Sequence, residues 1–76
     1  MPAEQPQWIR DALKSLGDRV RVARIHENLT QERLAELAEI DRSTVQRIEH
    51  GTGDAKFSHL LRIANALRIP IKHLMP

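Results

Sequence analysis

The segment TQERLAELAEIDRSTVQRIEHG, residues 30–51, constrains the fold more than any other part of the chain. Its apolar residues follow helical spacing from Thr30, the spacing breaks near residues 39–41, and it then resumes until Gly51. Thr30 suits a helix N-cap, because its hydroxyl can accept a hydrogen bond from the first turn, and Gly51 suits a C-cap. We therefore predict a helix over residues 30–38 and a second one that begins near residue 41 or 42 and ends at His50.

The flanking segments have the same helical character. Apolar residues recur at helical spacing within residues 8–16, 17–27 and 57–67, and no stretch alternates apolar and polar residues as a strand would. Gly17 separates the first two segments, which form either one continuous helix or two. Pro70 should begin a last short helix that turns Ile71 and Leu74 inward. The 76 residues therefore predict one all-α domain, residues 16–76, preceded by a partly helical N-terminal arm, residues 1–15.

The composition excludes several classes of protein. Without cysteine the chain has no disulfide framework and no thiolate metal site, and its four histidines lack the spacing that places two ligands on one helix face. No nucleophile motif surrounds a serine, so we expect no enzyme, no metal and no cofactor. No apolar run approaches the roughly 20 residues of a membrane span, and the first residues are unlike a signal peptide. We therefore expect a cytoplasmic protein that makes no membrane contact.

The second helix of the interrupted pair separates its side chains into two faces. Its inward face holds Thr44, Val45, Ile48 and Glu49, and its outward face holds Arg42, Ser43, Gln46, Arg47 and His50. Arginine, glutamine and serine are residues that hydrogen-bond to base edges. The N-terminus of the first helix, with Thr30 and Gln31, offers donors that suit a phosphate oxygen. A net charge of +2 does not by itself establish a polyanionic partner, but this distribution predicts binding to double-stranded DNA.

Three pieces, LTQERLAELAEI, STVQRIEHG and LLRIANALRI, occur in an order and spacing that resembles the lambda-repressor-like, or Cro-type (XRE), helix-turn-helix family. The resemblance covers about residues 16–75. It implies a five-helix domain of bacterial or phage type that binds operator DNA, usually as a two-fold dimer, and many members repress transcription. The first helix of the pair then fixes the position on the DNA backbone, and the second reads bases in the major groove.

The resemblance also implies roles for individual residues. Arg24 and Glu49 match a structural ion pair of the family, and the helical wheel places Glu49 at the edge of the inward face. His50 either touches a phosphate or simply ends its helix. The phosphate-binding candidates are Thr30, Gln31 and His50, and the base-reading candidates are Arg42, Ser43, Gln46 and Arg47.

Three features depart from the family pattern. Glu39 stands where the turn usually has glycine, and a left-handed conformation would cost it about 1 kcal/mol. Lys56 is a poor N-cap for the helix that follows. Residues 1–15 exceed the minimal domain and carry an apolar stripe of their own.

Two interpretations of that stripe remain open. The arm either folds back on the domain's own core, where Val22 and Ile25 could receive it, or it contacts a second subunit. The C-terminal region, Ile69–Met75, is the other candidate for a subunit contact. The candidate dimer contacts are therefore Trp8, Ile9, Leu13, Ile69, Ile71 and Leu74.

These features together predict a sequence-specific transcriptional regulator that acts as a homodimer, a repressor rather than an activator. The alternative is an antitoxin or accessory factor that binds both operator DNA and a protein partner. Arg42, Gln46 and Arg47 argue against a module that uses the fold without DNA. We expect no sensor domain after residue 76, and hence no small-molecule effector.

Overall fold

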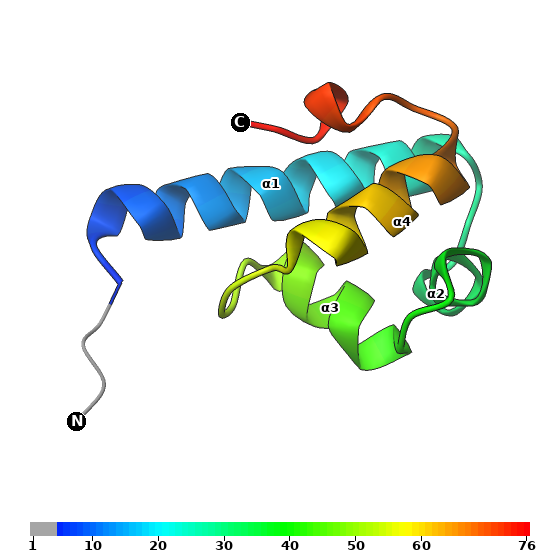
Figure 1. Ribbon diagram of the computed structural model, residues 1–76, viewed down its shortest axis with the longest axis horizontal. Helices are drawn as coiled ribbons and strands as arrows, with labels where there is room; N and C mark the ends of the chain where they lie inside the picture. The colour runs from blue at the N-terminus through cyan, green and yellow to red at the C-terminus, as the bar shows by residue number, and fades with distance from the viewer. Residues whose placement is uncertain (1–4) are drawn as a thin grey trace.

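The computed structural model describes residues 5–76 of the chain (Figure 1). The elements follow in the order α1 (Gln7–His26), α2 (Gln31–Ala38), α3 (Arg42–His50), α4 (Phe57–Leu67) and a 3-10 turn, η1 (Ile71–His73). The all-α class is confirmed, but the expected count of five helices is wrong. Within the described residues the fifth element is a single 3-10 turn of three residues, which follows Pro70 at its N-cap.

The helix α1 is continuous, so the segments on either side of Gly17 form one helix of 20 residues. The boundary expected between residues 15 and 16 therefore lies inside a helix, and the described part of the arm is not a separate element. A straight helix cannot fold back on itself, and Val22 and Ile25 remain 63% and 57% exposed. The interpretation that these two residues receive the arm is wrong. Residues 1–4 of the expected arm lie outside the described part of the chain.

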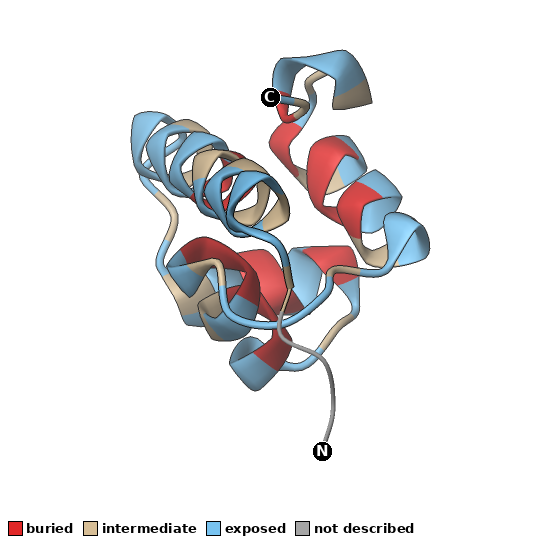
Figure 2. Cartoon of the chain, turned by 90° about the vertical axis from the view of Figure 1, so that its left-hand side faces the viewer, coloured by how far each residue is buried: buried red, intermediate tan, exposed pale blue. Residues whose placement is uncertain are grey.

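The core lies where α1, α2, α3 and α4 face one another (Figure 2). Each helix contributes apolar residues from one side, because side chains three and four apart share a helix face. Leu74 follows η1 and is fully buried, as the inward prediction required. The buried apolar side chains are Leu16, Val20, Leu34, Ala35, Ala38, Val45, Ile48, Leu60, Ile63, Ala64, Leu67 and Leu74.

The turns around α2 and α3 follow local chemistry. Thr30 Oγ1 accepts a hydrogen bond from the Arg33 N–H at 2.9 Å, which confirms the predicted N-cap. Glu39 ends α2 in the left-handed conformation with φ 57°, so the chain bears the cost that glycine would avoid. Gly51 ends α3 with φ 70°, where glycine is favoured. Lys56 gives α4 no side-chain cap. Among the described helices, none is long and apolar enough to cross a membrane.

Candidate nucleic-acid interface

The helices α2 and α3, with the turn at residues 39–41, form the surface on which the predicted reading residues lie. Along α3 the structure buries Thr44, Val45, Ile48 and Glu49 and exposes Arg42, Ser43, Arg47 and His50, with Gln46 between the two groups. This is the division that the helical wheel predicts, except that Gln46, expected on the outward face, is only partly exposed. The apolar side packs into the core, so the exposed row must face outward as one surface. Glu49 is the only acidic residue of α3, and it is buried.

A buried ion pair joins α3 to α1. The Arg24 guanidinium donates two hydrogen bonds to the Glu49 carboxylate, from Nε to Oε2 at 2.7 Å and from Nη2 to Oε1 at 3.0 Å. A third donor, Nη1, reaches the Leu29 carbonyl at 2.8 Å. The side chains of Arg24 and Glu49 are 13% and 3% exposed. Such a two-bond pair fixes the relative position of its helices, because both hydrogen bonds need one planar geometry.

Gln31 belongs to the same network, which the sequence did not predict. Its side-chain amide donates to Glu49 Oε1 at 3.1 Å. The amide nitrogen carries two hydrogens, so one remains for a further acceptor. Glu49 therefore receives donors from both α1 and α2 while it is itself part of α3. The partners are 18 residues apart in sequence, and no local pattern signals a contact over that separation.

The N-terminus of α2 offers backbone donors next to Gln31. The Thr30 hydroxyl oxygen accepts a hydrogen bond from the Arg33 N–H, and the Thr30 carbonyl accepts one from the Leu34 N–H at 3.0 Å. The N–H groups of Gln31 and Glu32 find no acceptor within residues 5–76. Unpaired N–H groups and the positive end of the helix dipole favour an anion at this position.

Two further contacts hold the exposed side chains of His50 and Arg42 in the protein without DNA. Nδ1 of His50 donates to the Gln46 carbonyl at 2.7 Å, since a carbonyl only accepts, so the ring is held against its own helix and presents Nε2. Arg42 Nη1 lies 3.7 Å from Glu32 Oε2, and both side chains are exposed. An exposed pair of this kind is weak, worth about 0–1 kcal/mol, so Arg42 can leave it for a stronger partner.

The candidate dimer contacts differ in accessibility. Trp8 is 71% exposed, whereas Ile9, Leu13, Ile69 and Ile71 are partly buried. Leu74 has no exposed surface, so its assignment as a dimer contact is wrong. It is buried because the segment after η1 turns its side chain into the core. Among residues 5–76, no group of three or more histidine, aspartate or glutamate side chains could hold a metal ion.

The arrangement of α2, the turn and α3 is that of a helix-turn-helix DNA-binding regulator. The family model described as helix-turn-helix matches residues 20–74, most of the chain. The chain therefore belongs to the lambda-repressor-like, XRE-type helix-turn-helix family and is a DNA-binding transcription regulator.

Solved structures agree with this assignment. The chain is similar to the restriction-modification controller protein C.AhdI from Aeromonas hydrophila, with 36% identity, a TM-score of 0.80, and coverage of 83% of this chain and 96% of that one. It is also similar to the hypothetical transcription factor NHTF from Neisseria, with 28% identity, a TM-score of 0.82, and coverage of 100% and 86%. The clp gene regulator ClgR from Corynebacterium glutamicum shares the fold, with 21% identity, a TM-score of 0.78, and coverage of 83% and 67%. No curated protein sequence matches the chain.

Proposed function

We propose that this protein is a sequence-specific repressor that binds operator DNA as a homodimer, with α3 of each copy in the major groove. The observation that carries the proposal is the charge division along α3. Both arginines of the helix are exposed on the outward row, and its one carboxylate is buried and paired with Arg24. The row therefore presents donors and positive charge, and no negative charge of its own, to the DNA.

The base-reading roles go to the outward row. Arg42 and Arg47 can each donate two hydrogen bonds to guanine, Gln46 suits adenine, and Ser43 suits either a base or a phosphate. The first turn of α3, which carries Arg42 and Ser43, is the part of a recognition helix that meets base edges. Arg47 lies one turn further along the same exposed side.

The phosphate-binding roles go to Thr30, Gln31 and His50. Gln31 is supported by its geometry, since Glu49 holds one N–H of its amide and leaves the other free. The adjacent backbone N–H groups of α2 add donors to the same position. Thr30 keeps its hydroxyl proton for a phosphate while its oxygen caps α2. Contacts of this kind position the protein without selecting a sequence.

The proposal of repression by a homodimer is supported by the way in which such a small domain can act. A two-fold dimer would place two α3 helices about 34 Å apart, one turn of DNA, and would read both halves of a symmetric site. A dimer that covers a promoter blocks it by occupancy, and this mode of repression requires no contact with another protein. C.AhdI is a controller protein, and its similarity supports a regulatory role.

The test is selection from a random duplex pool at moderate salt, followed by sequencing. We expect an enriched two-fold symmetric motif. Arg47→Ala should relax the preference at one position per half-site and cost about 1–3 kcal/mol there, whereas Gln31→Ala should weaken binding to all sequences alike. Lys72→Ala is the matched control, because it removes one positive charge from η1, on the opposite side of the molecule from α3 (Figure 1). Salt-sensitive binding without any enriched motif would refute sequence-specific reading.

A further inference from the structure

The helix α1 has an outer face that the domain covers only in part. Trp8, Ser15 and Val22 are spaced seven residues apart, which places them on one side of the helix, and Ala12 and Arg19 lie between them. Trp8 and Val22 are 71% and 63% exposed. The core residues of α1, Leu16 and Val20, lie on a different side. The helix therefore carries one stripe for its own core and a second, outer face with an exposed tryptophan at one end.

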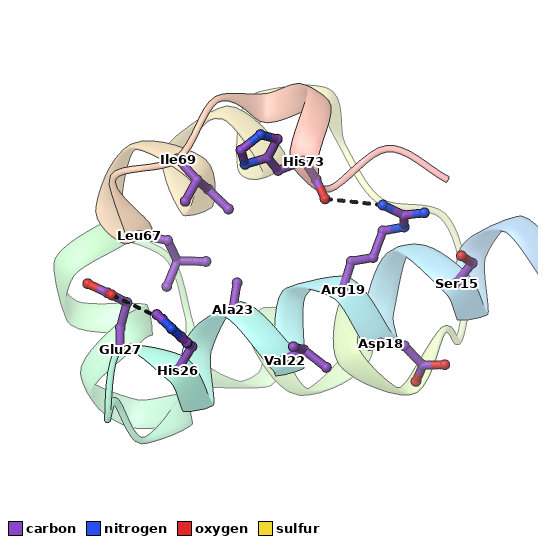
Figure 3. Close-up of a pocket in the computed structure, with 10 residues that line it drawn as sticks. All are labelled: Ser15, Asp18, Arg19, Val22, Ala23, His26, Glu27, Leu67, Ile69 and His73. Atoms are coloured by element: carbon purple, nitrogen blue, oxygen red, sulfur yellow. Dashed lines mark hydrogen bonds and ion pairs between the residues drawn. The ribbon is translucent and has the colours of Figure 1, made fainter.

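A groove lies at the other end of this outer face (Figure 3). The C-terminal half of α1 forms one wall, the segment from Leu67 to His73 forms the other, and the groove has a volume of about 460 Å³. Ala23, Leu67 and Ile69 line its apolar interior, and Val22 lies at its edge. This volume is in the range of about 300–1,000 Å³ that encloses a ligand or a large side chain.

We propose that two copies of this chain pair through the outer faces of antiparallel α1 helices, each inserting Trp8 into the groove of the other. The two-fold axis passes beside Ser15. Trp8 and Val22 are each seven residues from Ser15, about 10.5 Å along the helix, so the tryptophan of one copy comes opposite Val22 of the second. Small residues at the centre, Ala12 and Ser15, allow the helices to approach closely.

The charges on the same face agree with this arrangement. Asp11 and Arg19 are both exposed, and each is four residues from Ser15. In the antiparallel pair Asp11 of each copy therefore comes opposite Arg19 of the other, which gives two ion pairs by symmetry. In a parallel pair, Asp11 would face Asp11 and Arg19 would face Arg19. The charge pattern thus favours the antiparallel pair, since like charges in contact are destabilising.

A second copy of the chain accounts for both the exposed Trp8 and the open groove. The tryptophan and the groove lie at opposite ends of one straight helix, so a single chain cannot fill its own groove, whereas two copies fill both and close the assembly. Two buried tryptophans contribute about 300–500 Å², a large share of the roughly 1,000 Å² that a specific interface needs. Trp8 and Asp11 precede residues 20–74, where the family model matches, whereas Val22 and the apolar interior of the groove lie within those residues. The inference rests on the proposed function for the existence of a dimer and identifies the contact that makes it.

Trp8 is the only tryptophan of the chain and reports its own burial. Fluorescence emission and sedimentation molar mass are measured on the full chain over a dilution series. We expect a blue shift of the emission on concentration, with the same midpoint as the change from monomer to dimer mass. Emission that does not change with concentration, or a dimer in which Trp8 stays in water, would overturn the proposal.

Variants identify the surface. Val22→Lys adds a charge at a position exposed in the monomer, so it should fold normally and weaken the dimer by about tenfold or more. Asp11→Arg and Arg19→Asp should each weaken the dimer, and their combination should restore it. Phe57→Ala is the matched control, since Phe57 is 59% exposed on α4 and should have no effect. A dimer that survives Val22→Lys, or that Phe57→Ala disrupts instead, would contradict the proposed contact.

Binding to a single half-site separates this proposal from the proposed function. Val22→Lys should keep the Arg47-dependent base preference on a half-site duplex and lose the tight binding to the full symmetric site. If Val22→Lys left binding to both duplexes unchanged, the α1 contact would be wrong while DNA reading remained correct. If the wild-type protein showed no base preference on the half-site, DNA reading would be wrong whatever the dimer does.

Discussion

Replacement of Glu49 by alanine should destabilise the domain far more than an average substitution. The carboxylate accepts two hydrogen bonds from Arg24 and one from Gln31, and its side chain is only 3% exposed. Without it, the Arg24 guanidinium keeps the Leu29 carbonyl as its one acceptor within residues 5–76. A charged group would then remain largely buried without a counter-charge.

The magnitude follows from the burial of the two side chains. Removing one partner of a buried ion pair costs about 3–5 kcal/mol, because the remaining charge stays desolvated. Arg24 is 13% exposed, so water can reach part of the guanidinium, and we expect the lower end, about 3 kcal/mol. In a domain of this size 1 kcal/mol shifts the melting temperature by about 4–8 °C. The melting temperature should therefore fall by about 12–24 °C.

Urea denaturation followed by circular dichroism measures the free energy of unfolding directly. Replacing both Arg24 and Glu49 with methionine is the informative companion, because an apolar pair of similar size leaves no buried charge. The double variant should be clearly more stable than Glu49→Ala. A loss below about 1 kcal/mol in Glu49→Ala, or a double variant as unstable as the single one, would refute the argument from an uncompensated charge.

Three further substitutions test other parts of the structure. Glu39→Gly should raise the free energy of unfolding by about 1 kcal/mol in urea denaturation, since the residue has φ 57° and its ion pair with Arg62 is exposed. Gly17→Ala should lower the same quantity by about 1–3 kcal/mol despite the better helix propensity of alanine, because its Cβ would overlap the Ile48 carbonyl oxygen; an unchanged or higher stability would contradict that packing. Glu32→Gln should tighten DNA binding by about 0.5 kcal/mol in fluorescence anisotropy, since it frees Arg42 and removes a negative charge beside the proposed phosphate site.

The parts of the fold that the sequence predicts correctly depend on local chemistry. The N-cap at Thr30, the left-handed end at Gly51 and the bounds of α3 each follow from residues within one or two turns. The inward and outward faces of α3 follow from helical periodicity alone. The same local signals are enough to predict most of the candidate site, because its outward-facing residues are neighbours on the single helix α3.

The features that the sequence did not predict depend on contacts between distant segments. Gly17 weakens an isolated helix. Its role is seen only in the folded chain, where the α3 backbone passes so close that a side chain at this position would not fit. The hydrogen bond from Gln31 to Glu49 joins two helices whose relative angle has no local signature.

The position of α3 is set by two glycines and one ion pair, all at its contact with α1. A Cβ on Gly17 would come within 2.7 Å of the Glu49 carbonyl oxygen, and a Cβ on Gly51 would come within 2.8 Å of the Lys14 Cα. Each helix thus approaches the other at a residue without a side chain, and Arg24 then locks the separation through Glu49. Because Glu49 also accepts a hydrogen bond from Gln31, the same contact fixes the position of the proposed phosphate donor relative to the proposed base-reading residues of α3. The long helix α1 is therefore the support that orients the DNA-binding surface as well as the element that carries the outer face.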